Sequence, residues 1–320
     1  MKSKKWVLMA LLLSFVPYFI FSFLVLNFKN LYMNQEYPMW NDVKNKIYNN
    51  SNHEFDILYI GDSRAKAGLI VKDFEVLTKL QVLNLTIGGS TPIEGYYSIK
   101  EILKNNQIDK IILSYAPFHI AHADSYWHRT VKFEFFKDDI YEEIYQNALK
   151  MNESYFLERS YKDYKIKIGL YLTDFQNGIR YKRWIKNYEV YNYLNESKGH
   201  YYFGKLNGTS DLNSEASTKL FKPLPLIDFY LKEIVKLANE YGIKIFWFTM
   251  PFNKSSFDKT SEQYIKEYNI YINSFSSDNF IVLNSLYYKE DKEFGDPSHL
   301  YLGAKDVTLE LSNLINILNN

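Results

Sequence analysis

The chain has 320 residues, with 38 lysine and arginine against 37 aspartate and glutamate residues, and a formal net charge of +1. This balance argues against a nucleic-acid-binding protein that works by broad electrostatics, because such proteins carry a basic excess. Hydrophobic residues make up 47% and charged residues 23%, which excludes a chain that is disordered throughout. There is no cysteine, so thiolate zinc sites, iron–sulfur clusters, disulfides and cysteine nucleophiles are excluded.

The chain begins with an uncharged apolar run after a basic start. Residues 6–26 read WVLMALLLSFVPYFIFSFLVL and follow MKSKK. About 20 apolar residues span the hydrocarbon core of a bilayer, and basic residues before the run favour an N-terminus that stays in the cytoplasm. We therefore predict a cytoplasmic tip and a single transmembrane anchor within residues 1–29, with the rest of the chain outside. The alternative is a cleaved signal peptide, whose apolar region is shorter and ends at small residues.

The rest of the chain predicts a stalk and one large domain. Residues 30–54 are polar and aromatic, and we expect a stalk or a short helix there. Residues 55–320 contain five near-continuous apolar runs, which are typical of strands buried on both faces of a parallel sheet. The runs are FDILYIG (55–61), QVLNLTI (81–87), KIILSYA (110–116), KIFWFTM (244–250) and NFIVLNS (279–285).

Helical patterns alternate with these runs. They cover residues 66–79, 92–106, 225–241, 259–275 and 303–318. This alternation predicts an α/β fold, namely a three-layer α/β/α sandwich with a mainly parallel five-stranded sheet. Residues 118–222 interrupt it, because they contain no convincing buried strand. We expect a mostly helical insertion there, which ends in a Gly/Asn/Ser-rich loop at 205–217 and builds the mouth of a site.

In an open parallel sheet, ligands bind beyond the carboxyl ends of the strands. Ser63 follows the first strand in the turn Gly-Asp-Ser-Arg, where its hydroxyl would stand at a helix N-terminus that can stabilise an oxyanion. Alternatively, Ser63 is only the N-cap of that helix. Gly89 follows the second strand, where a glycine lets the backbone approach a ligand closely. Its alternative is an ordinary turn before a helix that begins at Pro92.

A carboxylate and an imidazole follow the last strand. Asp296 and His299 lie three residues apart on a loop that contains Pro297. This spacing lets the aspartate hold one ring nitrogen and leaves the other free to act as a base. The alternative is a capping aspartate beside a surface histidine.

Taken together, the motifs GDSR (61–64), NLTIGG (84–89) and DPSHL (296–300) resemble those of the SGNH/GDSL hydrolase superfamily, whose fold is flavodoxin-like. The resemblance covers most of residues 55–318. It implies that Ser63 is the nucleophile and that Ser63 and Gly89 supply oxyanion-hole N–H groups. It also implies that His299 is the general base and Asp296 its orienting partner.

One block departs from the family pattern. Many members carry G-x-N-D after the third strand, where the Asn donates to the oxyanion, but this chain has SYAPFH at 114–119. His119 is a candidate to replace that donor or to contact substrate. The departure, the anchor and Arg64 resemble a membrane-tethered branch that serves alginate O-acetylation and teichoic-acid D-alanylation. That branch implies a bacterial cytoplasmic membrane and a multi-pass membrane O-acyltransferase as a partner.

Other groups of residues allow further interpretations. One interpretation is a metal site formed by His119, His122, Asp124 and His128. The alternative is that this stretch is only a polar loop beside the catalytic site. Arg64 either binds a substrate carboxylate or phosphate or pairs with a nearby acid such as Asp62. The aromatic residues of the insertion either stack on sugars or pack a helical subdomain; they include Tyr126, Trp127 and Trp184.

We therefore expect a membrane-anchored, extracytoplasmic serine esterase or O-acyltransferase that needs no cofactor or metal and binds no nucleic acid. The resemblance implies an O-acylated, for example O-acetylated, cell-surface glycan or polymer as substrate. Hydrolysis and transfer use the same site, so the sequence does not separate them. One alternative is a non-catalytic accessory protein of a membrane acyltransferase complex. Another is a phosphate-handling α/β protein that uses Arg64 and a helix N-terminus.

Overall fold

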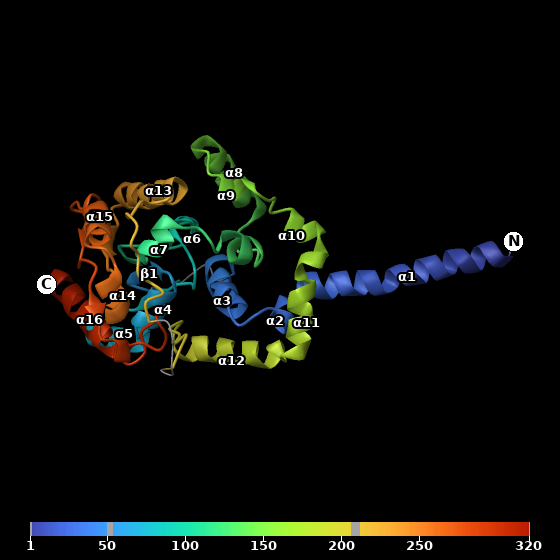
Figure 1. Ribbon diagram of the computed structural model, residues 1–320, viewed down its shortest axis with the longest axis horizontal. Coiled ribbons are helices and arrows are strands. Elements are labelled where there is room, and N and C mark those ends of the chain that lie inside the picture. The colour runs from blue at the N-terminus through green and yellow to red at the C-terminus, as the bar shows by residue number, and fades with distance from the viewer. Residues whose placement is uncertain (1, 50–53, 206–211, 320) are drawn as a thin grey trace.

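The computed structural model describes residues 2–49, 54–205 and 212–319 (Figure 1). Its strands are β1 (Ile57–Gly61), β2 (Val82–Asn84), β3 (Lys110–Ser114), β4 (Lys244–Trp247), β5 (Phe252–Asn253), β6 (Phe280–Val282) and β7 (Tyr288–Lys289). The helices up to the end of the insertion are α1 (Lys2–Asn27), α2 (Lys29–Tyr32), α3 (Tyr37–Tyr48), α4 (Ser63–Gly68), α5 (Val71–Thr78), α6 (Pro92–Ile102), α7 (Pro117–Ala121), η1 (Tyr126–Val131), α8 (Asp138–Met151), α9 (Ser154–Leu157), α10 (Asp163–Ile166), η2 (Ile168–Tyr171), α11 (Leu172–Arg180) and α12 (Arg183–Glu196). The later helices are α13 (Pro225–Tyr241), α14 (Lys254–Lys259), α15 (Glu262–Asn273), η3 (Asp291–Glu293) and α16 (Ala304–Asn319).

The five expected apolar runs form one parallel sheet in the order β2-β1-β3-β4-β6. Leu58 of β1 pairs with Leu83 of β2 and with Ile111 of β3, and Ile245 of β4 pairs with Ile111 and with Phe280 of β6. The strand order reverses at β1, which is the topological switch point where α/β proteins place their ligands. The predicted α/β fold with a five-stranded parallel sheet is confirmed.

Helices cover both faces of this sheet, because each strand is apolar on both sides. Leu58 and Ile60 of β1 belong to one buried cluster, which α6 and α13 complete. Ile57 and Tyr59 point the other way into a second cluster, which α5 and α16 complete. The result is a helix–sheet–helix arrangement. In Figure 1, α6 and α13 lie on one side of β1, and α5 and α16 lie on the other.

The helix expected at 66–79 is two helices, α4 and α5. Helix α4 begins earlier, at Ser63, because the side chain of Asp62 accepts hydrogen bonds from the first free N–H groups. It ends at Gly68, where a Cβ would lie 2.5 Å from the sulfur of Met250. Leu69 then becomes extended, and Thr308 accepts a hydrogen bond from the next N–H, that of Ile70. The helix expected at 259–275 is α15, and the short helix α14, which ends at Lys259, precedes it.

The insertion is mostly helical from α7 to α12, and its described residues after Glu196 contain no helix. Residues 206–211 of the expected loop at 205–217 lie outside the described residues. The small parallel pair β5–β7 was not predicted from the sequence, because two-residue strands carry no periodic signal.

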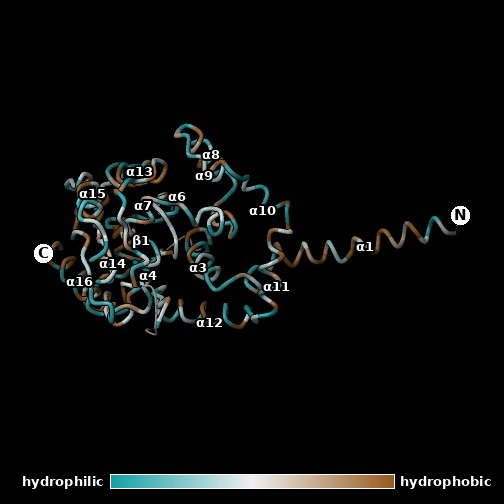
Figure 2. The backbone as a smooth tube through the Cα atoms, in the orientation of Figure 1, coloured by the Kyte–Doolittle hydropathy of each residue, from teal (hydrophilic) through white to brown (hydrophobic). Residues whose placement is uncertain are grey.

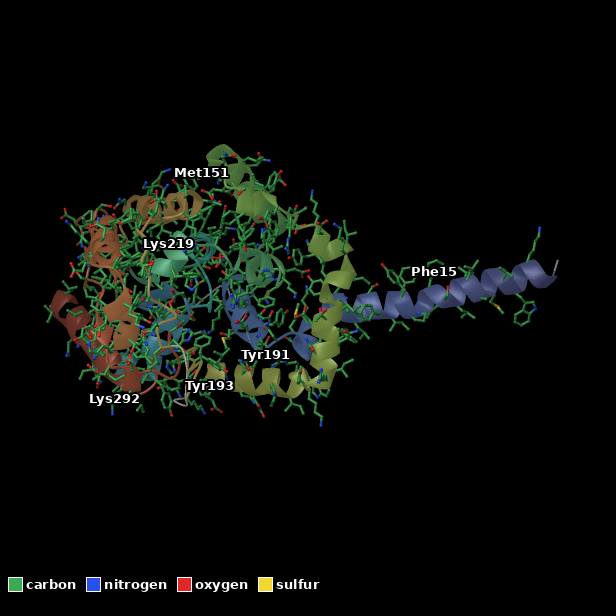
Figure 3. All side chains as sticks on the ribbon, in the orientation of Figure 1. Phe15, Met151, Tyr191, Tyr193, Lys219 and Lys292 are labelled. Carbon is green, nitrogen blue, oxygen red and sulfur yellow. The ribbon has the colours of Figure 1, made fainter. Side chains whose placement is uncertain are left out.

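Helix α1 is apolar on all sides and long enough to cross a membrane. The most apolar 18 residues of α1 contain no residue that the rest of the structure buries. Figure 3 shows Phe15 on the part of α1 that extends away from the domain. A helix of this length and composition near the N-terminus is compatible with a signal anchor or a signal sequence.

The segment for which we expected a stalk or a short helix contains helix α3. Helix α3 buries Trp40 and Val43 in the main apolar core. The indole Nε1 of Trp40 donates a 3.2 Å hydrogen bond to the carbonyl oxygen of Gly88, beyond the end of β2. Helix α3 is therefore part of the domain and reaches the edge of the sheet. Residues 50–53 lie outside the described residues.

We predict that Gly61→Ala disrupts the end of β1. A Cβ at Gly61 would lie 2.0 Å from the carbonyl oxygen of Ser114 in β3 and 2.7 Å from Cβ of Ala65. Overpacking of this kind costs about 1–3 kcal/mol or more. Thermal unfolding of the full chain in detergent should show the loss. Gly169→Ala is the matched control, because a Cβ there meets nothing within 4 Å. Equal stability of the two variants would contradict the close approach.

Candidate functional site

The edge of the sheet where the strands end carries a cluster of polar residues, as the sequence predicted. Ser63 follows β1 as the first residue of α4, and it is partly exposed. Its neighbour Asp62 is the N-cap, so Ser63 is not. Asp62 accepts through Oδ1 from the N–H groups of Arg64 (2.9 Å) and Ala65 (3.3 Å). The Ser63 hydroxyl makes no hydrogen bond in the described part of the chain, and it is therefore free for another partner.

The turn after β2 presents backbone N–H groups beside Ser63. Within the described residues, the N–H groups of Ser63, Gly88 and Gly89 donate no hydrogen bond. Trp40 donates to the carbonyl of Gly88, and the hydroxyl of Ser125 donates to the carbonyl of Gly89. In a trans peptide the C=O and the following N–H point in opposite directions. Trp40 thus fixes the direction of the Gly89 N–H, which makes this turn a rigid set of donors.

Gly89 has a positive φ of 80°, which a residue with a side chain rarely adopts. A Cβ at this position would also lie 2.9 Å from Nη1 of Arg129. Arg129 is held by two hydrogen bonds to Glu36, of 2.7 and 2.8 Å. The hydrogen bonds to Glu36 raise the pKa of Arg129 against the opposing effect of burial. A fixed cation therefore stands next to the Gly89 turn, which the sequence reasoning did not identify.

Asp296 and His299 pair as expected. The Nδ1 atom of His299 lies 2.9 and 2.8 Å from the two carboxylate oxygens of Asp296. Asp296 also accepts from the N–H groups of Ser298 (2.9 Å) and His299 (2.8 Å). Burial acts to raise the pKa of Asp296, but the hydrogen bonds and the charge of His299 outweigh it, and the pKa is lowered. The other ring nitrogen of His299, Nε2, is buried without a hydrogen-bond partner among the described residues.

Phe203 lies between His299 and the Gly88 turn. Its ring stacks on the His299 ring with centroids 4.4 Å apart. Two of its ring carbons lie 3.5 Å from the position that a Cβ on Gly88 would take, and Cβ of Ser63 lies 3.7 Å from that same position. Gly88 therefore lies next to both Ser63 and Phe203, and Phe203 lies next to His299. No hydrogen bond joins Ser63 to His299 in the described residues, and Phe203 covers the imidazole.

The partner of Arg64 differs from the acid suggested by the sequence. Its guanidinium pairs with Glu215, not with Asp62, and lies over the ring of Phe252. Glu215 also accepts from the hydroxyl of Ser298, next to His299. Burial acts to raise the pKa of Glu215, but Arg64 and the Ser298 hydrogen bond lower it overall. Glu215 thus connects α4 to the His299 loop, a contact across 151 residues that no local pattern could have indicated.

His119 follows β3 in α7 and faces the buried carboxylate of Asp62. Its Nε2 lies 4.0 Å from Oδ2 of Asp62. Burial lowers the pKa of His119 more than the charge of Asp62 raises it, so the neutral form is favoured. Oδ2 of Asp62 also accepts a 2.6 Å hydrogen bond from the N–H of Ala116. The segment SYAPFH at 114–119 is thereby fastened to the turn that carries Ser63.

Lys66 is a residue that sequence reasoning missed. It lies one turn after Ser63 on α4 and is fully buried, with Nζ donating 2.9 Å to the carbonyl oxygen of Thr86. Burial, together with the charge of Lys46, lowers the pKa of Lys66 to about 7. The spacing of three residues from Ser63 was visible in the sequence, but its burial was not, because it depends on the loop after β2.

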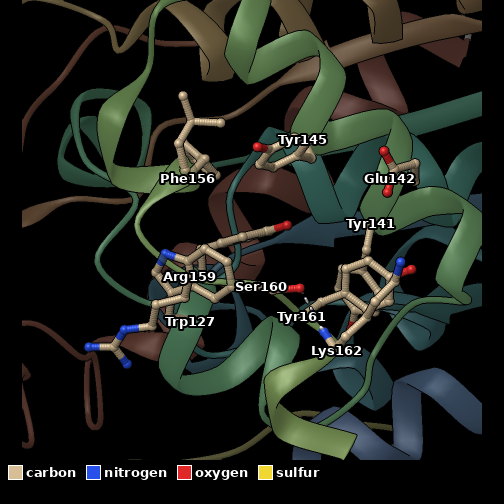
Figure 4. Close-up of a pocket in the computed structure, with 11 residues that line it drawn as sticks. Trp127, Tyr141, Glu142, Tyr145, Phe156, Arg159, Ser160, Tyr161 and Lys162 are labelled. Atoms are coloured by element: carbon tan, nitrogen blue, oxygen red, sulfur yellow. Dashed lines mark hydrogen bonds between the residues drawn. The ribbon is translucent and has the colours of Figure 1, made fainter.

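The aromatic residues of the insertion divide between two places. Tyr126 and Trp127 are buried and line a cavity of about 270 Å³ between η1, α8 and the segment 156–162 (Figure 4). Trp127 stacks on Tyr164 and donates to the carbonyl of Tyr155, so it packs the helical subdomain. Neither Ser63 nor His299 lines this cavity. Trp184 lies elsewhere and is exposed.

The histidine-rich stretch does not form a metal cluster. Among the described residues, no group of three or more histidine, cysteine, aspartate or glutamate side chains could hold a metal ion. His122 instead packs its ring against Phe118.

The protein is therefore an α/β protein with a five-stranded parallel sheet and a cluster of polar residues beyond the carboxyl ends of its strands. No family model matches the chain, and no curated protein matches it either.

We predict that Lys66→Met changes the pH dependence of stability. The pKa of Lys66 is about 7 in the folded chain and about 10.4 in the unfolded one. Between these values the unfolded state binds more protons, so Lys66 makes stability rise with pH, by at most about 1.4 kcal/mol per unit. The stability of Lys66→Met relative to wild type should therefore be greatest near pH 7 and fall toward pH 9.

Thermal unfolding of the full chain in one detergent, at several pH values, measures this difference. Lys292→Met is the control, because Lys292 is exposed. If the difference in stability between Lys66→Met and wild type did not vary with pH, Lys66 would not be a buried amine that titrates in this range.

Proposed function

We propose that the protein is a membrane-anchored serine esterase or O-acyltransferase of the SGNH/GDSL type. The observation that carries the proposal is the Asp296–His299 pair, which leaves Nε2 of His299 unpartnered at the edge of the sheet where Ser63 begins a helix. The free hydroxyl of Ser63 and the unpartnered N–H groups of Ser63 and Gly89 support it. These are the parts that acyl transfer through a serine needs.

In the proposed reaction, Oγ of Ser63 attacks the carbonyl carbon of an ester while Nε2 of His299 takes the hydroxyl proton. The N–H groups of Ser63 and Gly89 donate to the oxyanion of the tetrahedral intermediate. His299 then returns the proton to the leaving alkoxide, and an acyl-Ser63 ester remains. Water completes hydrolysis of this ester, whereas a sugar or polymer hydroxyl completes transfer. Asp296 holds the tautomer in which Nδ1 carries a proton and Nε2 does not.

The third oxyanion donor is the part of the family pattern that this chain lacks. Gly88 offers another unpartnered N–H in the same turn, and Arg129 places a cation beside Gly89. His119 is fastened to the Asp62 side of the cluster, and its neutral ring remains a candidate contact for substrate. Loss of one donor costs about 10²–10³ in rate where nothing replaces it.

The proposed location and substrate rest on the N-terminal helix and on the resemblance. Helix α1 would cross the cytoplasmic membrane of a bacterium once, with its lysines inside and the domain outside. The substrate class is an O-acylated cell-surface glycan or polymer. A multi-pass membrane O-acyltransferase is the proposed protein partner.

The second candidate is a non-catalytic accessory protein with the same fold. Phe203 favours it, because its ring stacks on His299 and lies against the Gly88 turn. A side chain in that place blocks an ester from reaching both Ser63 and His299 unless it moves. In this case the protein would assist a membrane acyltransferase without an acyl-enzyme of its own.

We predict that a fluorophosphonate probe labels the full chain in detergent at Ser63. Ser63→Ala and His299→Ala should each lower labelling by about 10³-fold or more, because nucleophile and base act as a unit. Release of p-nitrophenol from its acetate ester should fall in parallel. Ser276→Ala and His128→Ala are the matched controls, since both positions are exposed. A folded wild-type chain with neither labelling nor ester hydrolysis would favour the accessory protein.

We predict that Phe203→Ala raises the labelling rate of Ser63 if the protein is an enzyme whose site Phe203 covers. The substitution removes the ring that stacks on His299 and opens the space beside Gly88. The double variant Phe203→Ala, His299→Ala should lose that gain. Should Phe203→Ala label no faster than wild type, Phe203 would not be the barrier, and an inactive wild type would then count against a catalytic serine.

A further inference from the structure

The last turns of α1 pack against the insertion. Phe21 meets Phe175 of α11 edge to face, with ring centroids 5.1 Å apart. Val25 is fully buried, and its carbonyl accepts a 2.5 Å hydrogen bond from the hydroxyl of Tyr32. Tyr32 in turn meets Tyr171. Helix α1 and the segment from η2 to α11 therefore form one packed unit.

The position of this contact along α1 sets its depth in a bilayer. The apolar run ends at Leu26, five residues after Phe21. At 1.5 Å per residue, Phe21 lies about 7 Å inside the end of the run. A run of this length just fills a hydrocarbon core of about 30 Å. The side chain that touches Phe21, that of Phe175, would thus lie in the outermost layer of the hydrocarbon core, close to the headgroups.

The elements at this level expose apolar side chains. Ile166 is 73% exposed, Leu172 45% and Ile179 57%. Leu172 and Ile179 lie seven residues apart on α11, three residues before and four residues after Phe175, so they share a stripe of the helix with the ring that meets Phe21. Figure 1 shows α10 and α11 standing across the end of α1, as elements that lie along a membrane surface would. Figure 2 shows brown, apolar stretches in this column beside the apolar α1.

A basic and aromatic stretch continues this surface. Residues 180–186 read RYKRWIK and contain four basic and no acidic residues. Trp184 is 41% and Ile185 47% exposed at the start of α12. Basic residues next to exposed Trp and apolar side chains suit the headgroup region of an anionic membrane. By contrast, Lys165 and Lys167 already pair with Asp138 and Asp163, so the free positive charge lies mainly in 180–186.

We propose that residues 163–186 form a collar that lies in the outer lipid interface around α1. Ile166, Leu172, Ile179 and Ile185 enter the boundary between headgroups and acyl chains, and the basic residues of 180–186 contact anionic headgroups. The occupant of this exposed face is the lipid bilayer itself, because the collar is continuous with the helix proposed to cross it. The inference rests on the proposed membrane anchoring of α1, and it adds that the domain is held in one orientation on the membrane.

The absence of cysteine makes a direct test possible, because a single introduced thiol carries the only label. The full chain is reconstituted into vesicles of phosphatidylglycerol and phosphatidylethanolamine. A nitroxide is attached in turn to Ile166→Cys and Ile179→Cys in the collar, to Phe15→Cys in α1 and to Ile317→Cys in α16. Ile317 is the matched control, because it is an isoleucine that is 70% exposed at the far end of the domain. Collisions of each nitroxide with oxygen, which enters lipid, are compared with those of a water-soluble nickel chelate.

The expected result is that the labels at 166 and 179 collide several-fold less with the chelate than the label at 317, and more with oxygen. The label at 15 should show the strongest lipid signature. If the label at 15 is in lipid but those at 166 and 179 match 317, the collar is overturned and the anchor stands. If 166 and 179 are shielded from both reagents, protein covers this face and the lipid proposal is overturned. A label at 15 that collides freely with the chelate overturns both the anchor and the collar.

Discussion

The buried carboxylate of Asp62 is the contact on which the arrangement of the site depends. It is fully buried, and it accepts from the N–H groups of Arg64 and Ala65 in α4 and of Ala116 after β3. A buried carboxylate without such donors would cost several kcal/mol, so the chain can fold only if these three N–H groups converge. Their convergence starts α4 at Ser63, frees its hydroxyl and fastens the segment before His119 to the same point.

The turn at Gly88 and Gly89 is held by segments that lie far from it in the chain. Trp40 and Glu36 come from the segment before the sheet, and Ser125 and Arg129 come from the insertion. Each acts on the direction or the surroundings of these two peptide groups. A turn this small has too few atoms to fix its own peptide planes, so the domain uses both additional segments to do so.

The sequence was sufficient for the main strands and the longer helices, and insufficient for short elements, helix boundaries and long-range contacts. Buried parallel strands and helices repeat with short periods, so the five-stranded sheet and the pairing of Asp296 with His299, three residues apart, were predictable. Glu215 was not, because it pairs with Arg64 across 151 residues. Phe203 and Trp40 were missed for the same reason: an aromatic residue in a polar stretch looks like ordinary packing until the fold brings it to the sheet edge. The division of α4 from α5 depended on Met250 and Thr308, which are equally remote.

The insertion connects the end of the domain that carries α1 to the candidate site. Its η1 turn carries Arg129 beside Gly89, its α11 helix packs on Phe21 of α1, and its last residues carry Phe203 onto His299. Glu215 then ties it to α4. A displacement of α11 relative to α1 would therefore be passed along α12 toward the aromatic ring that covers the imidazole. This continuity gives a physical route by which a change in the packing of α1 on α11 reaches the ring that stacks on His299.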